Sequence, residues 1–199
     1  MTRAIIIFMG AFAAITMSYA ALALLPSLQL ATIEPTPGRD AYTFEEARGR
    51  DVYIREGCIY CHSQQVRPDG FGNDIQRGWG SRGSLPGDYA FDRPHLLGTM
   101  RTGPDLHDIA NRQPSQDWHL AHLYQPRSVS PGSIMPAYPY LFDVKPKSQV
   151  LPSEETVPIS PDYAPPDGQV VVATADALAL YEYLMTLKLE PIDDEQGGS

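Results

Sequence analysis

The sequence is poor in cysteine and in basic residues, and both shortages limit what the protein can be. Its 199 residues include two cysteines, Cys58 and Cys61, so a scaffold of several disulfide bonds is excluded. Fifteen Lys and Arg against 24 Asp and Glu give a formal net charge of −9, which argues against nucleic acid as a partner. The length allows one domain with an appendage, and the 19 prolines and 16 glycines predict a loop-rich fold.

Charge is also missing near the N-terminus, where no charged residue occurs between Ala4 and Leu25. These 22 residues would extend about 33 Å as a helix, and a bilayer core is about 30 Å thick. We therefore predict a transmembrane anchor over residues 4–25. A cleaved secretory signal is the alternative, although the apolar core of such a signal is usually shorter, about 7–15 residues. Both interpretations place the rest of the chain outside the cytoplasm, because Arg3 precedes the apolar run and the next positive charge is Arg39.

Composition divides the rest of the chain into three further parts. Residues 26–42 are rich in proline and predict an extended linker. Residues 43–189 form the predicted folded domain, and residues 190–199 form an acidic tail. From Glu154 to Ser199 the chain has ten acidic residues and one lysine. This excess indicates either a solvated face or a docking surface for a basic partner.

The helical signals are short, and they predict a mostly α-helical, loop-rich domain. Thr43 and Glu46 fit a capping box at the start of the first helix. The three helices expected run from Phe44 to about Arg55, from Gln116 to Tyr124, and from the cap Thr174 to about Lys188. The last helix has an apolar stripe that should face a core, formed by Leu180, Tyr183, Leu184 and Leu187. Ten prolines between residues 126 and 166 exclude a long helix from that stretch.

The two cysteines lie in the pattern Cys-x-x-Cys-His, which is the attachment signature of a c-type haem. Cys58 and Cys61 can both reach the vinyl groups on one edge of a porphyrin, and His62 then meets the iron. A zinc site would need four ligands, and the chain has no second cysteine pair. A thioredoxin-like motif expects a βαβ context, and a plain disulfide leaves His62 unexplained. The sequence therefore predicts one covalently bound haem c.

A methionine is expected as the sixth ligand of the iron, and elimination favours Met135. Met9 and Met17 lie in the predicted anchor, and Met185 lies in the last helix. Met100 is the alternative, but the segment around it is expected on the histidine side of the haem. Met135 is followed by proline in an irregular stretch that can cover a haem face without breaking a helix. A thioether ligand raises the reduction potential and fills the last iron position, which favours electron transfer over catalysis.

Further residues are candidates for contacts around the haem. A haem histidine normally donates its free ring N–H to a fixed acceptor, and we assign this role to the carbonyl of Pro104. Trp118 is expected to contact the haem through its indole N–H, with a core position as the alternative. His119 and His122 lie on one helical face, but two ligands alone make a poor metal site. We also expect Gly49 and Tyr53 to cross Tyr183, with glycine allowing close approach.

Several stretches between Gly49 and Leu141 resemble the mono-haem subunit (subunit II) of cbb3-type cytochrome c oxidases. The matching stretches are Gly49–Cys58, Cys61–Gln64, Asp92–Pro94, Arg101–Leu106, Asp117–His119, His122–Tyr124, Pro126-Arg127 and Met135–Pro139. The haem motif is common to class I cytochromes c, whereas the string from Trp118 to Pro139 is more specific. The glycine-rich stretch Asp69–Gly87 departs from the family pattern, and the sequence assigns it no role.

The resemblance implies a class I cytochrome c domain on a single membrane helix, with His62 and Met135 as axial ligands of the haem iron. It implies an anchor in the bacterial inner membrane with the domain on the periplasmic side. The subunit would pass electrons to the haem-copper core subunit of the oxidase, and it would have no catalytic site of its own. A further c-type cytochrome subunit or a soluble cytochrome c would supply the electrons.

Two other classes remain open at the level of sequence. One is a haem c subunit that donates electrons to another membrane reductase, such as nitric oxide reductase. The other is a haem enzyme or gas sensor with an open iron position. For the oxidase interpretation, we expect the segment Trp118–Arg127 to contact the membrane core subunit, because it mixes aromatic and hydrogen-bonding side chains.

Overall fold

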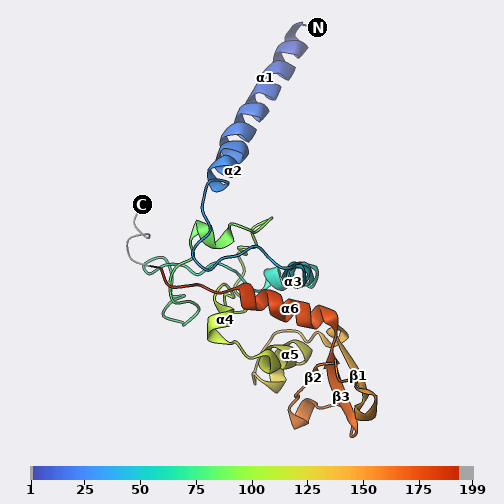
Figure 1. Cartoon of the computed structure of the whole chain (residues 1–199). Coiled ribbons are helices and arrows are strands. Elements are labelled where there is room, and N and C mark those ends of the chain that lie inside the picture. The colour runs from blue at the N-terminus through green and yellow to red at the C-terminus, as the bar shows by residue number, and fades with distance from the viewer. Residues whose placement is uncertain (1, 193–199) are drawn as a thin grey trace. The chain divides into compact units, whose positions relative to one another are not determined.

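The computed structural model describes residues 2–192, and it is mostly helical with one small sheet (Figure 1). The chain divides into two compact units. The first unit consists of Met1–Asp40 and Leu85–Arg93, and the second consists of Ala41–Ser84 and Pro94–Ser199. The predicted acidic tail, residues 190–199, lies mostly outside the described residues.

The first unit contains one long apolar helix. It comprises α1 (Thr2–Tyr19), a π-helical turn (Ala20–Leu24) and α2 (Leu25–Leu30). The whole run, Thr2–Leu30, is long and apolar enough to cross a membrane, and none of the residues of α1 or α2 is buried. A signal sequence near the N-terminus meets the same criteria of length and composition. The structure therefore contains one candidate membrane span among its described residues.

The helix continues beyond the end of the predicted anchor, through Pro26 as far as Leu30. The linker expected from residue 26 is thus helical in its first part, and this expectation was wrong there. Pro26 occupies the first turn of α2, directly after the π-helical turn, in which the Leu25 N–H donates to the Ala20 carbonyl five residues earlier. This wider turn accommodates a proline ring that would otherwise clash with the carbonyl four residues before it.

The remainder of the first unit joins two segments that are distant in sequence. The Thr36 hydroxyl donates to the Asp88 carboxylate at 2.7 Å, and the Thr36 N–H donates to the Gly87 carbonyl at 3.3 Å. A Cβ on Gly87 would lie 2.6 Å from the Glu34 carbonyl oxygen, so only glycine permits this approach. The structure thus groups Leu85–Arg93 with the N-terminal residues, whereas the sequence places it within a single domain over residues 43–189.

The second unit is organised by the crossing of two helices, α3 (Phe44–Arg55) and α6 (Ala175–Thr186). A Cβ on Gly49 would lie 1.8 Å from the Ala179 carbonyl oxygen, which shows how closely the backbones approach. Beside this contact the rings of Tyr53 and Tyr183 pack edge to face, with centroids 5.5 Å apart. The predicted crossing of Gly49 and Tyr53 with Tyr183 is confirmed, and the stripe of α6 is buried as expected.

Local signals set the ends of these helices. The Thr43 hydroxyl accepts from the Glu46 N–H while the Glu46 carboxylate accepts from the Thr43 N–H, so the predicted capping box is present. Helix α5 (Gln116–Tyr124) has the predicted bounds and begins at Ser115, whose hydroxyl accepts from the Trp118 N–H. A four-residue helix, α4 (Ile109–Arg112), precedes it.

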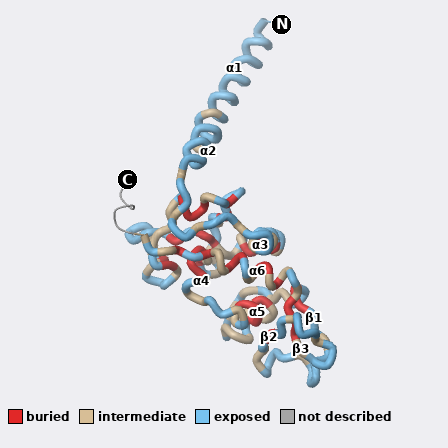
Figure 2. Tube along the Cα trace, in the orientation of Figure 1, coloured by how far each residue is buried: buried red, intermediate tan, exposed pale blue. Residues whose placement is uncertain are grey.

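Buried residues of this unit lie on α3, α5 and α6, on the middle strand of the sheet and in the loops between these elements (Figure 2).

The sequence did not predict the sheet. Three antiparallel strands, β1 (Phe142–Pro146), β2 (Thr156–Val157) and β3 (Gln169–Ala173), form it in the order β1-β3-β2. Phe142 pairs with Ala173 and Pro146 with Gln169, so proline lies at the end of an edge strand, where it is tolerated. Residues 126–166 contain no α-helix, as predicted, and the β-branched Val171 and Val172, which follow this stretch, are buried in strand β3.

Candidate functional site

One cavity of about 560 Å³ in the second unit brings together the six residues that the sequence predicts as site residues. Its volume is within the range typical of cofactor sites. Its walls include the six predicted site residues, namely Cys58, Cys61, His62, Pro104, Trp118 and Met135. The fold therefore forms the candidate site from segments that are distant in sequence, between residues 53 and 184.

The Cys-x-x-Cys-His motif forms a compact turn directly after α3. Gly57 has φ of 74°, a left-handed conformation that favours glycine, and this turns the chain out of the helix. The N–H groups of Cys61 and His62 both donate to the Cys58 carbonyl, at 3.1 and 3.0 Å. Both cysteines are free thiols, and burial raises the pKa of Cys58 to about 12. The turn thus presents two thiols and an imidazole to the same cavity.

The imidazole of His62 is held by its neighbours. Its Nδ1 lies 2.8 Å from the Pro104 carbonyl oxygen, so the hydrogen bond expected from the sequence is present. Since a carbonyl only accepts, Nδ1 carries the proton and Nε2 is left with a lone pair. Burial lowers the pKa of His62 despite the hydrogen bond to Pro104, which favours the neutral, metal-binding form.

Gly103 is a site residue that sequence reasoning missed. A Cβ at this position would lie 2.2 Å from Cε1 of His62 and within 2.8 Å of both ring nitrogens. The imidazole ring therefore rests directly against the backbone of residue 103. A Gly-Pro pair was the only signal in the sequence, and it is equally consistent with a simple turn.

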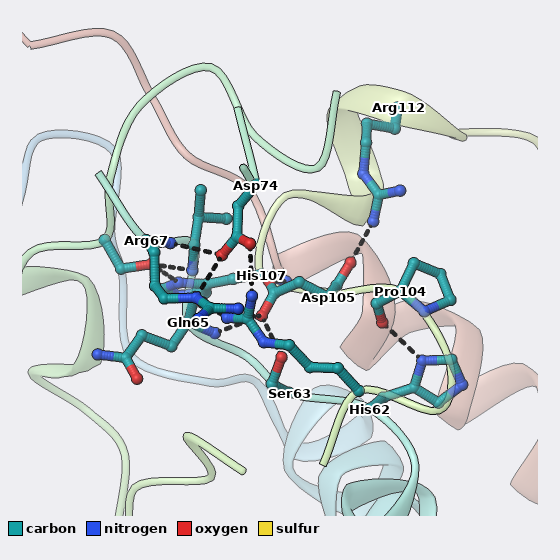
Figure 3. Close-up of polar contacts among 12 residues, drawn as sticks. His62, Ser63, Gln65, Arg67, Asp74, Pro104, Asp105, His107 and Arg112 are labelled. Carbon is teal, nitrogen blue, oxygen red and sulfur yellow. Dashed lines mark hydrogen bonds and ion pairs between the residues drawn. The ribbon is translucent and has the colours of Figure 1, made fainter. Parts of the chain in front are cut away.

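The chain segments that carry His62 and Pro104 run side by side (Figure 3). The Gly103 N–H donates to the Cys61 carbonyl at 2.9 Å, and the Leu106 N–H donates to the Ser63 carbonyl at 2.8 Å. Between these two bonds the Ser63 hydroxyl donates to the buried Asp105 carboxylate at 2.6 Å. Backbone and side-chain hydrogen bonds thus fix the histidine relative to its acceptor.

Met135 lines the same cavity from an irregular segment of the chain. Its N–H donates to the Ser133 hydroxyl at 3.2 Å, and the Tyr138 N–H donates to the Leu123 carbonyl of α5 at 2.9 Å. Among the methionines that the structure describes, Met135 alone lines the cavity. Met100 is 55% exposed, and Met185 packs against the hydrophobic core.

Helix α5 supplies the third part of the wall through Trp118, His119 and His122. The rings of Trp118 and His122 are stacked, with centroids 4.5 Å apart and an angle of 10° between planes. His119 is buried and its Nε2 lies 2.7 Å from the Gln113 carbonyl oxygen, so it donates there. Burial, and then the charges of His119 and His62, lower the pKa of His122 to about 4. The described residues contain no group of three His, Cys, Asp or Glu side chains that could hold a metal ion.

Two buried nitrogen atoms test whether the cavity suits a haem. Nδ1 of His122 and Nε of Arg112 have no hydrogen-bond partner among the described residues, and both residues line the cavity. A buried polar atom without a hydrogen-bond partner raises the free energy of the folded state. These two atoms are therefore consistent with a cavity that binds a ligand with acceptor groups. The haem carboxylates are such acceptors. Sequence reasoning missed Arg112, because nothing in its surroundings distinguishes it from a surface arginine.

Comparison with known families connects this site to a larger assembly. Residues 1–170 match the protein family described as "Cytochrome C oxidase, mono-heme subunit/FixO". The match includes the apolar N-terminal helix and every residue that lines the cavity except Leu180 and Leu184 of α6. The comparison with curated proteins gives no match.

Proposed function

Because the chain belongs to the family of mono-haem subunits of cytochrome c oxidase, we propose that it is a membrane-anchored electron carrier. In this proposal it holds one covalent haem c and passes electrons to the haem-copper core subunit of a cbb3-type oxidase. The observation that supports it best is the cavity itself. The Cys-x-x-Cys-His turn lines it, and a separate segment contributes Met135, the one described methionine that lines it.

Four side chains would hold the haem. Cys58 and Cys61 would form thioether bonds, and His62 and Met135 would bind the iron from the two faces. The haem supplies a reversible one-electron step between its ferric and ferrous states. The protein supplies the fixed imidazole, the thioether and an apolar enclosure that keeps water from the iron.

The two buried nitrogen atoms have a role in the same proposal. Arg112 and His122 would donate to the haem carboxylates, which would otherwise be buried without partners. Trp118 stacks on His122 and keeps its ring at the cavity wall. If His62 and Met135 both bind the iron, they would leave a substrate no free place on it, which favours a carrier over an enzyme or gas sensor.

Family membership makes the chain an oxidase subunit that associates with a membrane complex. We propose that Thr2–Leu30 is retained and spans the bacterial inner membrane, with the second unit on the periplasmic side. The core subunit would accept the electrons, and a further c-type cytochrome subunit or a soluble cytochrome c would supply them. The segment Trp118–Arg127 stays our candidate for the contact with the core subunit, although His119, His122 and Leu123 within it line the cavity.

The test is purification of the full chain from membranes of cells that can attach haem c. We expect a pyridine haemochrome spectrum of one haem bound through two thioethers, and a haem-copper oxidase core subunit among the co-purified proteins. Co-purification with a nitric oxide reductase core would instead support the alternative assignment. A chain that carries no covalent haem would contradict the proposal as a whole, and a mature protein beginning near Ala20 or Ala21 would contradict the anchor.

A further inference from the structure

The loop between Val66 and Ser84 has a buried carboxylate at its centre. Asp74 is 1% exposed, and its side chain accepts hydrogen bonds from the Arg67 N–H at 2.8 Å and from the guanidinium of Arg101. Burial raises the pKa of Asp74, but the hydrogen bonds from Arg101 and Arg67 outweigh this and hold it below its ordinary value. The loop therefore places a fixed negative charge against Arg101.

Arg101 connects this loop to the segment that supports His62. One of its nitrogen atoms donates to Asp74, and another donates to the Gln65 carbonyl at 2.6 Å and lies 3.7 Å from the Asp105 carboxylate. Trp79 of the same loop lies against the guanidinium, with its ring centroid 5.6 Å from Cζ. Arg101 is thus held between Asp74 of the loop and Asp105.

Asp105 is the next link, and it follows Pro104 directly in the chain. It is completely buried and accepts from the Ser63 hydroxyl at 2.6 Å, the Gln65 N–H at 2.8 Å and the His107 N–H at 2.8 Å. Burial raises the pKa of Asp105, and the three hydrogen bonds offset this only in part, but they hold the side chain in one place. Because Ser63 follows His62 and Asp105 follows Pro104, the hydrogen bond between them fixes the two residues whose contact orients the imidazole.

We propose that Asp74 and Asp105 are positioning residues for His62: the loop Val66–Ser84 acts through Asp74, Arg101 and Asp105 to hold the Pro104 carbonyl against Nδ1 of the histidine. This inference rests on the proposed function, in which His62 binds the haem iron. It gives the loop Val66–Ser84 a role, which is to set the orientation of His62 and the strength with which its imidazole donates electrons to the iron.

The expected consequence concerns the reduction potential. A firmly held acceptor on Nδ1–H makes the imidazole a better donor to the iron, which stabilises the ferric state. Removing the charge of Asp74 releases Arg101 and weakens the support of Pro104, so the ferric state loses stabilisation. The reduction potential should therefore rise, and the histidine ring should become less firmly oriented.

The test compares Asp74→Asn with Asp69→Asn in the full, haem-loaded chain. Asp69 is a matched control because it lies on the same loop and loses the same charge, but it is exposed and its side chain accepts from Gln76 rather than from Arg101. The readouts are the reduction potential, the paramagnetic NMR shifts of the haem methyl groups and the Nδ1–H proton of His62. We expect Asp74→Asn to raise the potential and to move these NMR signals, and Asp69→Asn to leave the signals in place.

Ser63→Ala gives a second test that changes no charge and keeps the carboxylates. It should shift the Nδ1–H and haem-methyl signals in the same direction as Asp74→Asn, and it decides the question if Asp74→Asn fails to take up haem. Signals of Ser63→Ala and Asp74→Asn that match those of Asp69→Asn would overturn the inference, even with lower stability. Failure of the proposed function looks different, since the unsubstituted chain would then lack a covalent haem with histidine and methionine ligands.

Discussion

The two walls of the cavity differ in how firmly the fold holds them. On the histidine wall, residues 61–65 and 103–107 are joined by backbone hydrogen bonds and by the Ser63–Asp105 contact. On the methionine wall, Ser130–Tyr138 is held by local turns, by the bond from Met135 to Ser133 and by the bond from Tyr138 to Leu123. Buried polar contacts are therefore concentrated around His62. We infer that the fold holds His62 more firmly than Met135. Of the two proposed iron ligands, Met135 is therefore the one that dissociates more easily.

Substitution of Gly103 should have the largest effect on haem content and stability, because it disturbs the histidine wall, which the fold holds more firmly. In Gly103→Ala the new Cβ would lie 2.2 Å from the His62 ring, so ring or backbone must move. Overpacking at such a site costs about 3 kcal/mol. We expect a large loss of covalently bound haem and a lower midpoint of chemical unfolding, measured by pyridine haemochrome yield and by denaturant titration. An unchanged yield and spectrum would show that the histidine wall adapts more easily than the comparison implies.

Substitution of Met135 should have the next largest effect and a different character. In Met135→Ala the haem should stay attached through Cys58, Cys61 and His62, while the sulfur–iron charge-transfer band of the oxidised protein disappears. Carbon monoxide should then bind the reduced protein, because the sixth position is open. Met100→Ala is the matched control, since Met100 is exposed and does not line the cavity. Loss of the band in Met100→Ala instead would refute the assignment of the ligand.

A smaller effect should appear as a dependence of stability on pH, from His119 on α5. Burial lowers the pKa of His119 in the folded protein, although the hydrogen bond to the Gln113 carbonyl raises it. In the unfolded chain the pKa is about 6.5, so the unfolded state binds more protons as the pH falls below that value. The free energy of unfolding should therefore decrease below pH 6.5, by about 1.4 kcal/mol for each unit by which the pKa is lowered.

This pH dependence can be assigned by a pair of variants. His119→Gln should flatten the decrease between neutral and mildly acidic pH, measured by denaturant titration of the haem-loaded protein. His95→Gln is the control, because His95 is an exposed histidine of the same unit. An equal slope in both variants would mean that His119 does not cause the dependence.

The smallest effect is expected from a pair of serines, one on each wall. Ser63 is 1% exposed and donates to a buried carboxylate, so Ser63→Ala should cost about 1–3 kcal/mol of unfolding free energy. Ser133 is only partly buried and accepts one backbone N–H, so Ser133→Ala should cost about 1 kcal/mol or less. Thermal unfolding monitored through the haem absorbance measures both. Equal losses of unfolding free energy in the two variants would contradict the inference that the histidine wall is held more firmly than the methionine wall.

Prediction from sequence succeeded where the signal was local. The capping box at Thr43 and the cap at Thr174 set helix starts through contacts within three residues. The hydrogen bond from His62 to Pro104 followed from the chemistry that any haem histidine requires. The sheet was missed because proline-rich segments carry a weak strand signal, and its pairing joins residues 14 to 31 positions apart, such as Val157 with Val171 and Phe142 with Ala173.

By itself the sequence determined the apolar helix, the three short helices and the Cys-x-x-Cys-His motif, since each depends on residue type and short spacing. Only the tertiary structure decided that Gly103 touches the His62 ring, that Arg112 lines the cavity and that Asp74 is buried and accepts from Arg101. The physical reason is that these roles depend on burial and on contacts between distant segments. A glycine, an arginine or an aspartate has the same covalent chemistry at the surface, and its role appears only when the fold removes it from water.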